Sequence, residues 1–329
     1  MNYILGIDQG GTKTAAIILN CEGVILGLGI SKGAYHTSDG LEYAMSAVSE
    51  AIKIAEESSQ IKLSQISSLV AGMTGMDWPH ERKLLKVALK AITGIENIEV
   101  HNDCIIAMYG GLNKSCGAVL CAGTGLNSAI ISPSGEEYIL GFYIDDDVQG
   151  GSALGKRAVR QVLDSEIGLC PNTKLKDMVL DYFKKKDIEE FLYYYATSSD
   201  SFEVKNLAPK IIDIASSGDE VAITLVSEFA KDMCKYVYAG LKKYNMLGLE
   251  IDVVLSGSIF KGEKNLMRDA VTNYIKDFAP KASIVNAKYE PVVGAGIMGL
   301  MAINNYSLSK EIEDNLANTA AIMNLNRGE

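Results

Sequence analysis

The chain has 329 residues, of which 48% are hydrophobic, so it is long enough for two domains with ample buried cores. Its formal net charge of -10 argues against nucleic acid and anionic membranes as partners, because both repel an acidic surface. The first residues lack a cationic leader, and the six cysteines never form a CxxC pair. We therefore expect reduced thiols and a cytoplasmic protein.

In chain order, the first hundred residues predict three strands and then alternating helices and strands. Ser38 or Asp39 is the expected N-cap of the first helix, and Pro79 begins the second. The order β-β-β-α-β-α-β-α is typical of an α/β domain. The expected strands are 3–7, 14–19, 23–32, 66–73 and 97–103, and the expected helices are 38–58, 79–92 and 104–111.

A second series of the same kind follows. It has three strands, helices through the 150s to the 240s with the longest from about Asp219 to Tyr244, and a final amphipathic helix at 307–324. We therefore predict two tandem α/β domains with a cleft between them, at 1–113 and 114–305. The second carries a helical insertion, and a helix at about 306–329 packs back on the first. The remaining expected strands are 116–125, 126–132, 136–144, 251–258 and 282–288, and the remaining helices are 263–279 and 291–305.

The bend GIDQGGTKT, between the first two strands, is crowded with residue types that bind ligands. Its glycines let backbone N–H groups approach a ligand, its threonines add hydroxyl donors and its lysine adds positive charge, which together suit phosphate oxygens. Asp8 ends the first strand and suits Mg²⁺ held through water. An ordinary glycine-rich turn is the alternative. The candidate phosphate-binding residues are Gly10, Gly11, Thr12, Lys13 and Thr14.

The bend CAGTGLNSA stands at the matching position of the second series. It repeats the same chemistry of two glycines and one hydroxyl between two strands, so we expect the two bends to grip one polyphosphate. Each bend is followed by a strand and not by a helix, which excludes a Walker A loop and a dinucleotide fingerprint. The candidate residues are Gly123, Thr124 and Gly125.

Asn102 and Asp103 lie where the last strand of the first series ends and a helix begins. Because the carboxyl ends of strands line ligand sites in open α/β sheets, Asp103 is a candidate base for an attacking hydroxyl. An N-cap is the alternative role for this aspartate.

Three further segments contain small or acidic residues at element boundaries. Asp147, in GFYIDDDVQGGSALGKRAV, either hydrogen-bonds substrate hydroxyls or belongs to a solvated acidic turn. The small residues of VVLSGSIFKG and EPVVGAGIMGL admit a flat purine ring, although a glycine pattern inside a helix also suits close packing, above all at Gly299. The candidate adenosine residues are Gly257, Ser258, Gly294 and Ala295.

These motifs in this order resemble the BadF/BadG/BcrA/BcrD ATPase family, in its N-acetylglucosamine kinase-like branch, from Gly6 to about Leu300. The resemblance implies two ribonuclease H-like domains of the actin-like ATPase superfamily, with ATP and Mg²⁺ as cofactors. It assigns GIDQGGTKT and AGTGLN to the two phosphate motifs, Asp103 to catalysis, and VLSGSIFKG and GAGIMG to adenosine binding. It also implies a homodimer.

The resemblance further implies a set of sugar-binding residues. Two departures fall on this side: DDVQGGS replaces the family's GDEGS, and Tyr35 and His36 stand where relatives often present an asparagine. Asp77 and Trp78 border the same side. The candidate sugar-binding residues are Tyr35, His36, Gly75, Asn102, Asp103, Asn127 and Asp147.

The leading hypothesis is an amino-sugar kinase that moves the γ-phosphoryl group of ATP to the 6-hydroxyl of N-acetylglucosamine, glucosamine or N-acetylmuramic acid. The alternatives are an ATPase that activates a dehydratase or reductase through an iron–sulfur cluster, and another hexose kinase of the same superfamily. A transcriptional regulator with this fold would need a DNA-binding segment, and we expect none before Tyr3.

Overall fold

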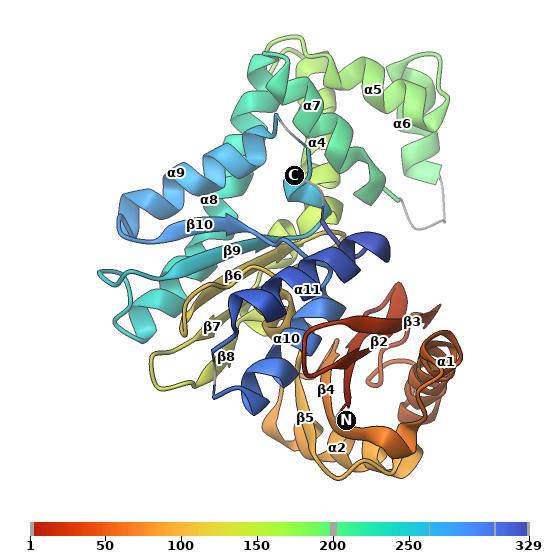
Figure 1. Cartoon of the computed structure of the whole chain (residues 1–329). Coiled ribbons are helices and arrows are strands. Elements are labelled where there is room, and N and C mark those ends of the chain that lie inside the picture. The colour runs from red at the N-terminus through yellow and green to blue at the C-terminus, as the bar shows by residue number, and fades with distance from the viewer. Residues whose placement is uncertain (1–2, 198–202, 263, 306, 328–329) are drawn as a thin grey trace. The chain divides into compact units, whose positions relative to one another are not determined.

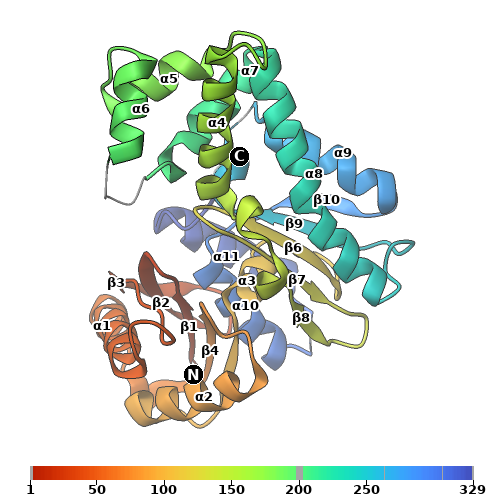
Figure 2. The ribbon, with the colours of Figure 1, turned by 180° about the vertical axis from the view of Figure 1, so that it is seen from behind.

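The structure is a computed structural model that describes residues 3–197, 203–262, 264–305 and 307–327 (Figures 1 and 2). By its contacts the chain divides into two compact units. The first unit contains the residues up to Ser115 and those from Val285 onward, and the second contains Cys116–Ile284.

The first unit is built on a five-stranded sheet of order β3-β2-β1-β4-β5. β1 pairs antiparallel with β2 and parallel with β4, and β4 pairs parallel with β5. Its strands are β1 (Tyr3–Gln9), β2 (Lys13–Asn20), β3 (Ile25–Lys32), β4 (Ile66–Met73) and β5 (Ile98–Asn102). Its helices are α1 (Leu41–Ser59), α2 (Pro79–Thr93), α3 (Asp103–Tyr109), α10 (Pro291–Ile303) and α11 (Lys310–Ile322), with a 3₁₀ turn at Leu63–Gln65.

Alternate residues of the central strands bury opposite faces of this sheet, as the two-residue period of a strand requires. Leu5 and Ile7 pack with α1 and α2 in one apolar cluster, whereas Ile4 and Ile17 pack with α10 and α11 in another. Both faces of β1 are therefore covered, which explains why the strand reads as a nearly continuous apolar run.

The second unit repeats the topology of the first. Its sheet has the order β10-β9-β6-β7-β8, with β6 antiparallel to β7 and parallel to β9, so that β6 and β7 correspond to β1 and β2. Its strands are β6 (Gly117–Ala122), β7 (Leu126–Ile131), β8 (Glu137–Ile139), β9 (Asp252–Ser256) and β10 (Ser283–Asn286). Its helices are α4 (Gly150–Glu166), α5 (Leu175–Phe183), α6 (Ile188–Thr197), α7 (Ala208–Ser216), α8 (Glu220–Lys243) and α9 (Leu266–Phe278), and its 3₁₀ turns are η2 (Gly141–Tyr143), η3 (Asp146–Val148), η4 (Lys205–Leu207) and η5 (Ser258–Phe260).

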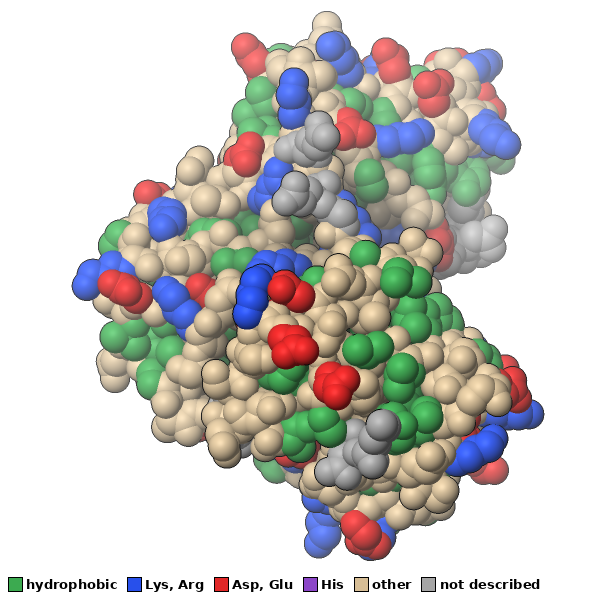
Figure 3. All heavy atoms as spheres, viewed as in Figure 1, with side chains coloured by type: hydrophobic (Ala, Val, Ile, Leu, Met, Phe, Trp, Pro, Cys, Tyr) green, Lys and Arg blue, Asp and Glu red, His purple; other side chains and the backbone are tan. Residues whose placement is uncertain are grey.

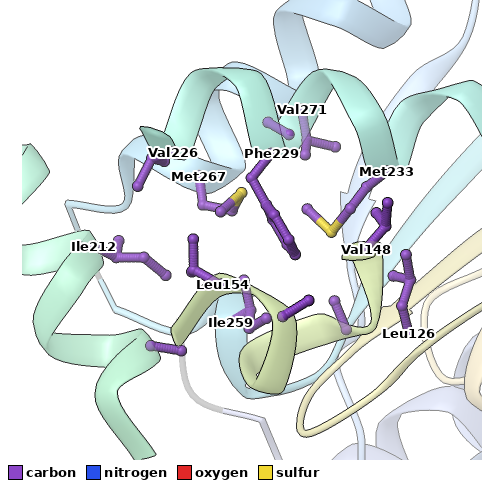
Figure 4. Packing of buried hydrophobic residues seen from close by; sticks show 14 of the residues in the cluster. Leu126, Val148, Leu154, Ile212, Val226, Phe229, Met233, Ile259, Met267 and Val271 are labelled. Atoms are coloured by element: carbon purple, nitrogen blue, oxygen red, sulfur yellow. The ribbon is translucent and has the colours of Figure 1, made fainter. Parts of the chain in front are cut away.

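The core of the second unit anchors the loops that border the β6–β7 bend. Phe229 of α8 is fully buried, and the side chains around it come from several elements (Figure 4). Leu126 follows the bend directly, Val148 ends η3 and Ile259 follows Ser258, and all three belong to this cluster. The polar loops between these anchors are thus fixed by apolar burial.

The tandem arrangement and most of the predicted elements are confirmed, and the structure differs from the prediction at two element ends. The strand predicted at 136–144 ends at Ile139, because the chain turns into η2. The N-cap of α1 is Gly40, since the carboxylate of Asp39 accepts the N–H of Tyr35 instead. The start of the helix predicted at 263–279, residue 263, lies outside the described residues, as do 306, 328 and 329 of the last predicted segment.

The largest difference concerns α10, which belongs by its contacts to the first unit, whereas the sequence placed residues up to 305 in the second. α10 is apolar on every side, and nine of its residues are buried. A helix that is apolar on every side is stable only when it is buried, and α10 packs against β1, β2, β4 and α3. The last helix, α11, also joins the first unit, as predicted.

Surface features agree with the composition. Acidic and basic side chains are interspersed on the face shown in Figure 3. All six cysteines lie within the described ranges, and none forms a disulfide bond. Within the same ranges, no helix combines the length and apolar character that a bilayer span requires.

Gly294 provides a test of the packing of α10. A Cβ atom at this position would lie 1.9 Å from the carbonyl oxygen of Ile106 in α3. We expect Gly294→Ala to lower the free energy of unfolding by roughly 1–3 kcal/mol, measured by urea denaturation. Gly248→Ala is the matched control, because nothing lies within 4 Å of its Cβ position. Equal stability of the two variants would contradict close packing of α10 on α3.

Candidate active site

The carboxyl ends of three parallel strands meet at one edge of the first sheet. Gln9 of β1 pairs with Met73 of β4, which pairs in turn with Asn102 of β5. This register brings Asp8 and Asp103 close enough for their charges to interact, although they are far apart in the sequence. The sheet topology therefore creates a pair of carboxylates from two predicted site residues.

Asp8 is buried at the end of β1. Burial, with the nearby charges of Asp103 and Glu290, raises the pKa of its carboxyl group to about 7, while Lys13 and Arg327 act in the opposite direction. Asp8 is therefore a carboxylate whose charge needs a positive partner. This is the property expected of a residue that holds a divalent cation.

Asp103 is the first residue of α3, and Asn102 is the N-cap of that helix. Burial of its carboxyl group raises the pKa of Asp103, and hydrogen bonds from the Thr74 hydroxyl and the Cys104 N–H partly offset this effect. The N–H of Cys104 lies 2.9 Å from Oδ1 of Asp103. The capping role therefore falls to Asn102, and Asp103 keeps a carboxylate oriented by two donors.

Asn102 is fully buried, and its side chain has a positioning role. Its Oδ1 accepts the N–H of Cys104 at 2.9 Å, and its Nδ2 donates to Oδ1 of Asp77 at 2.9 Å and to the carbonyl of Met76. Asn102 thus ties the loop after β4 to the start of α3. This replaces the predicted direct sugar contact of Asn102, since its side chain is enclosed by protein.

The predicted sugar-binding residues of the first unit lie together. Burial raises the pKa of Asp77 to about 6, and the charges of Asp103 and Glu81 add to this effect. Glu81 accepts the N–H groups of Asp77 and Trp78, and its other oxygen lies 3.5 Å from Nε2 of His36. The ring of His36 also borders Gly75, because its Cε1 lies 3.6 Å from the Cβ position of that glycine.

His36 is buried, and its two ring nitrogens have no hydrogen-bond partner among the described residues. Tyr35 is exposed, and its phenol ring lies over Gly11, so that a Cβ atom on Gly11 would meet the ring at 2.2 Å. A larger residue at position 11 would therefore have to displace the exposed ring of Tyr35. It also links the predicted sugar side to the first phosphate bend.

The bend between β1 and β2 places its predicted residues in different surroundings. Gly11 and Thr12 are exposed, and the N–H of Gly10 donates to the carbonyl of Lys13 at 2.9 Å. Nζ of Lys13 lies 3.2 Å from Oε2 of Glu290. Thr14 differs from the prediction, because it is fully buried and its hydroxyl donates to the carbonyl of Lys32, which ties β2 to β3.

The bend between β6 and β7 is shaped by backbone contacts. The carbonyl of Gly123 accepts the N–H of Gly151 at 2.8 Å, and the carbonyl of Thr124 accepts that of Ser152 at 3.1 Å. Thr124 and Gly125 remain exposed. The bend is therefore docked on the start of α4 through its carbonyl oxygens.

Gly150 and Gln149 complete this docking. Gly150 has a φ of +52°, and a Cβ atom there would lie 2.2 Å from the carbonyl oxygen of Gly125, so only glycine fits. Oε1 of Gln149 accepts the N–H of Leu126 at 3.1 Å. Gln149 was missed by the sequence analysis, although the Gln-Gly-Gly-Ser sequence before a helix marks its place.

Gly257 and Ser258, the candidate adenosine residues of the second unit, lie beside the β6–β7 bend. Gly257 has a φ of +115° and passes the carbonyl of Ala122 so closely that a Cβ atom would lie 2.0 Å away. Oγ of Ser258 lies 3.8 Å from the Cβ position of Gly123. These three residues of the second unit are therefore brought together.

Asn127 and Asp147, the predicted sugar-binding residues of the second unit, are both accessible. Oδ1 of Asn127 accepts the N–H of Ser128 at 2.8 Å and lies 2.9 Å from the Cβ position of Gly141. Asp147 is exposed in η3, and its N–H donates to Asp145, the N-cap of that turn. The acidic segment thus includes the predicted capping turn.

Gly294 and Ala295 lie in the interior of the first unit and not at an accessible edge. Both are buried in α10, and Gly294 faces the backbone of α3. Helix packing therefore accounts for these small residues, which replaces the predicted contact with adenosine. The packing alternative stated for Gly299 also agrees with the structure, since its Cβ position lies 2.6 Å from Ile4.

Besides Gln149, four residues that position the site were not predicted. They are Thr74, which donates to Asp103; Glu81, which links Asp77 and His36; and Glu290 and Arg327, which lie near Lys13 and Asp8. Only Glu81 carries a local signal, because it stands three residues after Trp78 at the third position of a capping box.

Comparison with known proteins first defines the fold. The crystal structure of a ROK family glucokinase from Streptomyces griseus, in complex with glucose and AMPPNP, matches with a TM-score of 0.61 and 19% identity. The match covers 90% of this chain and 99% of that one. The protein therefore shares the fold of that structure, which confirms the predicted tandem α/β architecture.

The sequence then defines the family. The profile of the BadF/BadG/BcrA/BcrD ATPase family matches residues 5–299, so the chain belongs to this family. It is 26% identical to the N-acetyl-D-glucosamine kinase of Dictyostelium discoideum over 315 residues, which cover 90% of this chain and 97% of the relative. It is 30% identical to the glucosamine kinase GspK of Vibrio cholerae serotype O1 over 243 residues, which cover 73% and 80%.

The environment of Asp8 predicts a pH-dependent gain of stability in Asp8→Asn. In the folded state the carboxyl group of Asp8 keeps its proton up to about pH 7, whereas in the unfolded state it loses the proton near its ordinary pKa of 3.8. Because the folded state binds the proton more tightly, the free energy of unfolding falls as the pH rises between these values and is lowest above pH 7. In Asp8→Asn the neutral amide never carries a charge, so this loss of stability at higher pH does not occur. Without metal or nucleotide, we expect the gain to grow by up to about 1.4 kcal/mol per pH unit between pH 5 and 7.

Urea denaturation in EDTA at pH 5 and pH 8 measures this difference. Asp269→Asn is the control, because Asp269 is exposed in the first turn of α9. An Asp8→Asn gain of the same size at both pH values would show that Asp8 is not protonated more readily in the folded state.

Proposed function

We propose that the protein is an ATP-dependent amino-sugar kinase, which transfers the γ-phosphoryl group to the 6-hydroxyl of N-acetylglucosamine or of a close relative such as glucosamine or N-acetylmuramic acid. The observation that carries the proposal is the pair formed by the buried Asp8 and the partly buried Asp103 at the carboxyl edge of the first sheet. The names of the two curated relatives, both amino-sugar kinases, support this substrate class.

Asp103 is the proposed base that orients the attacking hydroxyl. In phosphoryl transfer the transition state is loose, so such a residue mainly positions the nucleophile and accepts its proton late. Thr74 and the N–H of Cys104 fix its carboxylate, and burial raises its pKa toward that of an effective proton acceptor. One oriented carboxylate then serves both to align and to deprotonate the sugar hydroxyl.

Asp8 is the proposed magnesium residue. Among the described residues, no three His, Cys, Asp or Glu side chains come together to hold a metal ion. Asp8 would hold Mg²⁺ through water, which fits the preference of this ion for one or two carboxylates with much of its hydration retained. Bound Mg²⁺ would neutralise charge on the phosphates, and the buried position of Asp8 favours a positive ion beside it.

The proposed phosphate contacts come from one bend in each unit. In the first they are Gly10, Gly11, Thr12 and Lys13, and in the second Gly123, Thr124 and Gly125. Gly257 and Ser258 are the proposed adenosine contacts, because they border the second bend. The proposed sugar contacts are Tyr35, His36, Gly75, Asp77, Asn127 and Asp147.

We also propose a cytoplasmic homodimer. The cysteine thiols support the cytoplasm, and the family resemblance supports the dimer. Light scattering after gel filtration measures the oligomeric state, and a monomer at micromolar concentration would contradict this part of the proposal.

A panel of hexoses and hexosamines tests the substrate class through the release of ADP. We expect selective turnover of N-acetylglucosamine, glucosamine or N-acetylmuramic acid, with glucose and mannose at least tenfold slower. Faster turnover of a plain hexose would favour the alternative of another hexose kinase. ATP hydrolysis that no sugar stimulates would favour the alternative of an ATPase activator.

Asp103→Asn tests the proposed base. We expect kcat to fall by about 10²–10⁴-fold, because the amide cannot accept the proton, while binding of MgADP stays within about threefold. Asp269→Asn, an exposed change of the same chemistry, should keep full activity. A kcat of Asp103→Asn within about tenfold of the parent would show that this carboxylate only supports the start of α3.

A further inference from the structure

One carboxylate of the first unit joins two cations that are distant in the sequence. Oε2 of Glu290 lies 3.2 Å from Nζ of Lys13, and its Oε1 lies 3.1 Å from Nε of Arg327. Glu290 occupies the N-cap position of α10, but its side chain makes no cap hydrogen bond there. Its carboxylate therefore serves this ion cluster and not the helix.

The backbone holds Arg327 at this place. The N–H of Glu290 donates to the carbonyl of Leu325 at 2.8 Å, and the N–H of Arg327 donates to the carbonyl of Lys288 at 2.9 Å. Between them, Tyr289 and Asn326 form an antiparallel bridge. The segment after α11 is thus paired with the segment before α10, which fixes the guanidinium group beside Glu290.

The two cations differ in how firmly they are held. The side chain of Arg327 is 15% exposed and that of Lys13 is 47% exposed, so solvent screens the Lys13 pair more strongly. Arg327 is also the strongest of the charges that lower the pKa of Glu290. Arg327 is therefore the permanent partner of this carboxylate, and Lys13 is the exchangeable one.

This difference has a consequence for the first phosphate bend. If Glu290 had only Lys13 as a partner, withdrawing the lysine would leave a half-buried carboxylate without a counter-charge, which is costly. With Arg327 in place, Glu290 stays paired when Lys13 moves. The cost of turning Lys13 toward another anion is lowered accordingly.

We propose that Arg327 is a positioning residue for nucleotide binding, which retains Glu290 so that Lys13 can leave it for a phosphate of the nucleotide. The proposal rests on the proposed function in one respect, namely that a nucleotide phosphate lies at the β1–β2 bend. Arg327 acts on Lys13 through Glu290, its charge also lowers the pKa of Asp8, and no direct contact with the nucleotide is assigned to it.

A double-mutant cycle tests this mechanism, with MgADP as the titrant in isothermal calorimetry. Arg327→Met should weaken MgADP binding by at least fivefold, because Glu290 then retains Lys13. Glu290→Gln should leave binding within twofold of the parent or tighten it, because Lys13 is released. The double variant should return to within twofold of Glu290→Gln.

Other outcomes overturn the proposal. If the double variant binds as weakly as Arg327→Met, the arginine contacts the nucleotide directly or only supports the fold. If Arg327→Met binds MgADP like the parent, or the parent does not bind MgADP, Arg327 has no role in binding. If Arg327→Met does not fold, Arg327→Gln replaces it, because glutamine keeps a hydrogen-bond donor for Glu290 without the charge. The same changes in MgADP affinity are then expected for Arg327→Gln alone and combined with Glu290→Gln.

Two further measurements separate positioning from structural support. Arg327→Lys should restore MgADP binding to within about twofold of the parent, and the KM for the sugar should stay within twofold in every variant. Lys310→Met removes the exposed pair of Lys310 with Asp314 and should change neither quantity. Binding of MgADP needs no sugar. If the double-mutant cycle gives the expected result but the protein phosphorylates no amino sugar, only the proposed function is overturned.

Discussion

The enclosure of carboxylates at the carboxyl edge of the first sheet is the constraint on which the site depends. A charged group in a protein interior is unfavourable, and two like charges nearby add to this cost. Burial raises the pKa of both Asp8 and Asp103, and the charge of Asp103 adds to this effect at Asp8, because the register of β1, β4 and β5 brings the two residues near each other. Thr74, the Cys104 N–H and two cations offset only part of this, so the site favours a positive ligand.

The two units share a topology but contribute different chemistry. The bend of the first unit is surrounded by charged side chains, with Asp8 and Lys13 as its nearest examples. The bend of the second unit is fixed by backbone carbonyls, by the amide of Gln149 and by Gly150. The first bend is therefore distinguished by its charged side chains, and the second by a cradle of backbone groups.

The sequence predicted what depends on local order and missed what depends on distant contacts. The hairpins, the strand ends and the position of Asp103 follow from residues that are neighbours in the chain. Lys13 and Glu290 are 277 residues apart, and no local pattern indicates that pair. The predicted role of Gly294 was wrong for another reason, because a small residue suits both ligand binding and close helix packing. Only the position of the Ile106 carbonyl in the folded chain distinguishes the two roles. The predicted role of Thr14 was wrong because a threonine hydroxyl can donate to a backbone carbonyl of a neighbouring strand as well as to a phosphate oxygen.

The first unit is discontinuous, since the chain leaves it at Ser115 and returns only at Val285. The whole second unit is therefore synthesised before α10. Until then, Ile4, Ile17 and Leu19 have no cover on the sheet face that α10 and α11 will occupy. The strands of the first sheet are thus synthesised before the second unit, but this apolar face is covered only afterwards, and such transiently exposed surface is prone to aggregation.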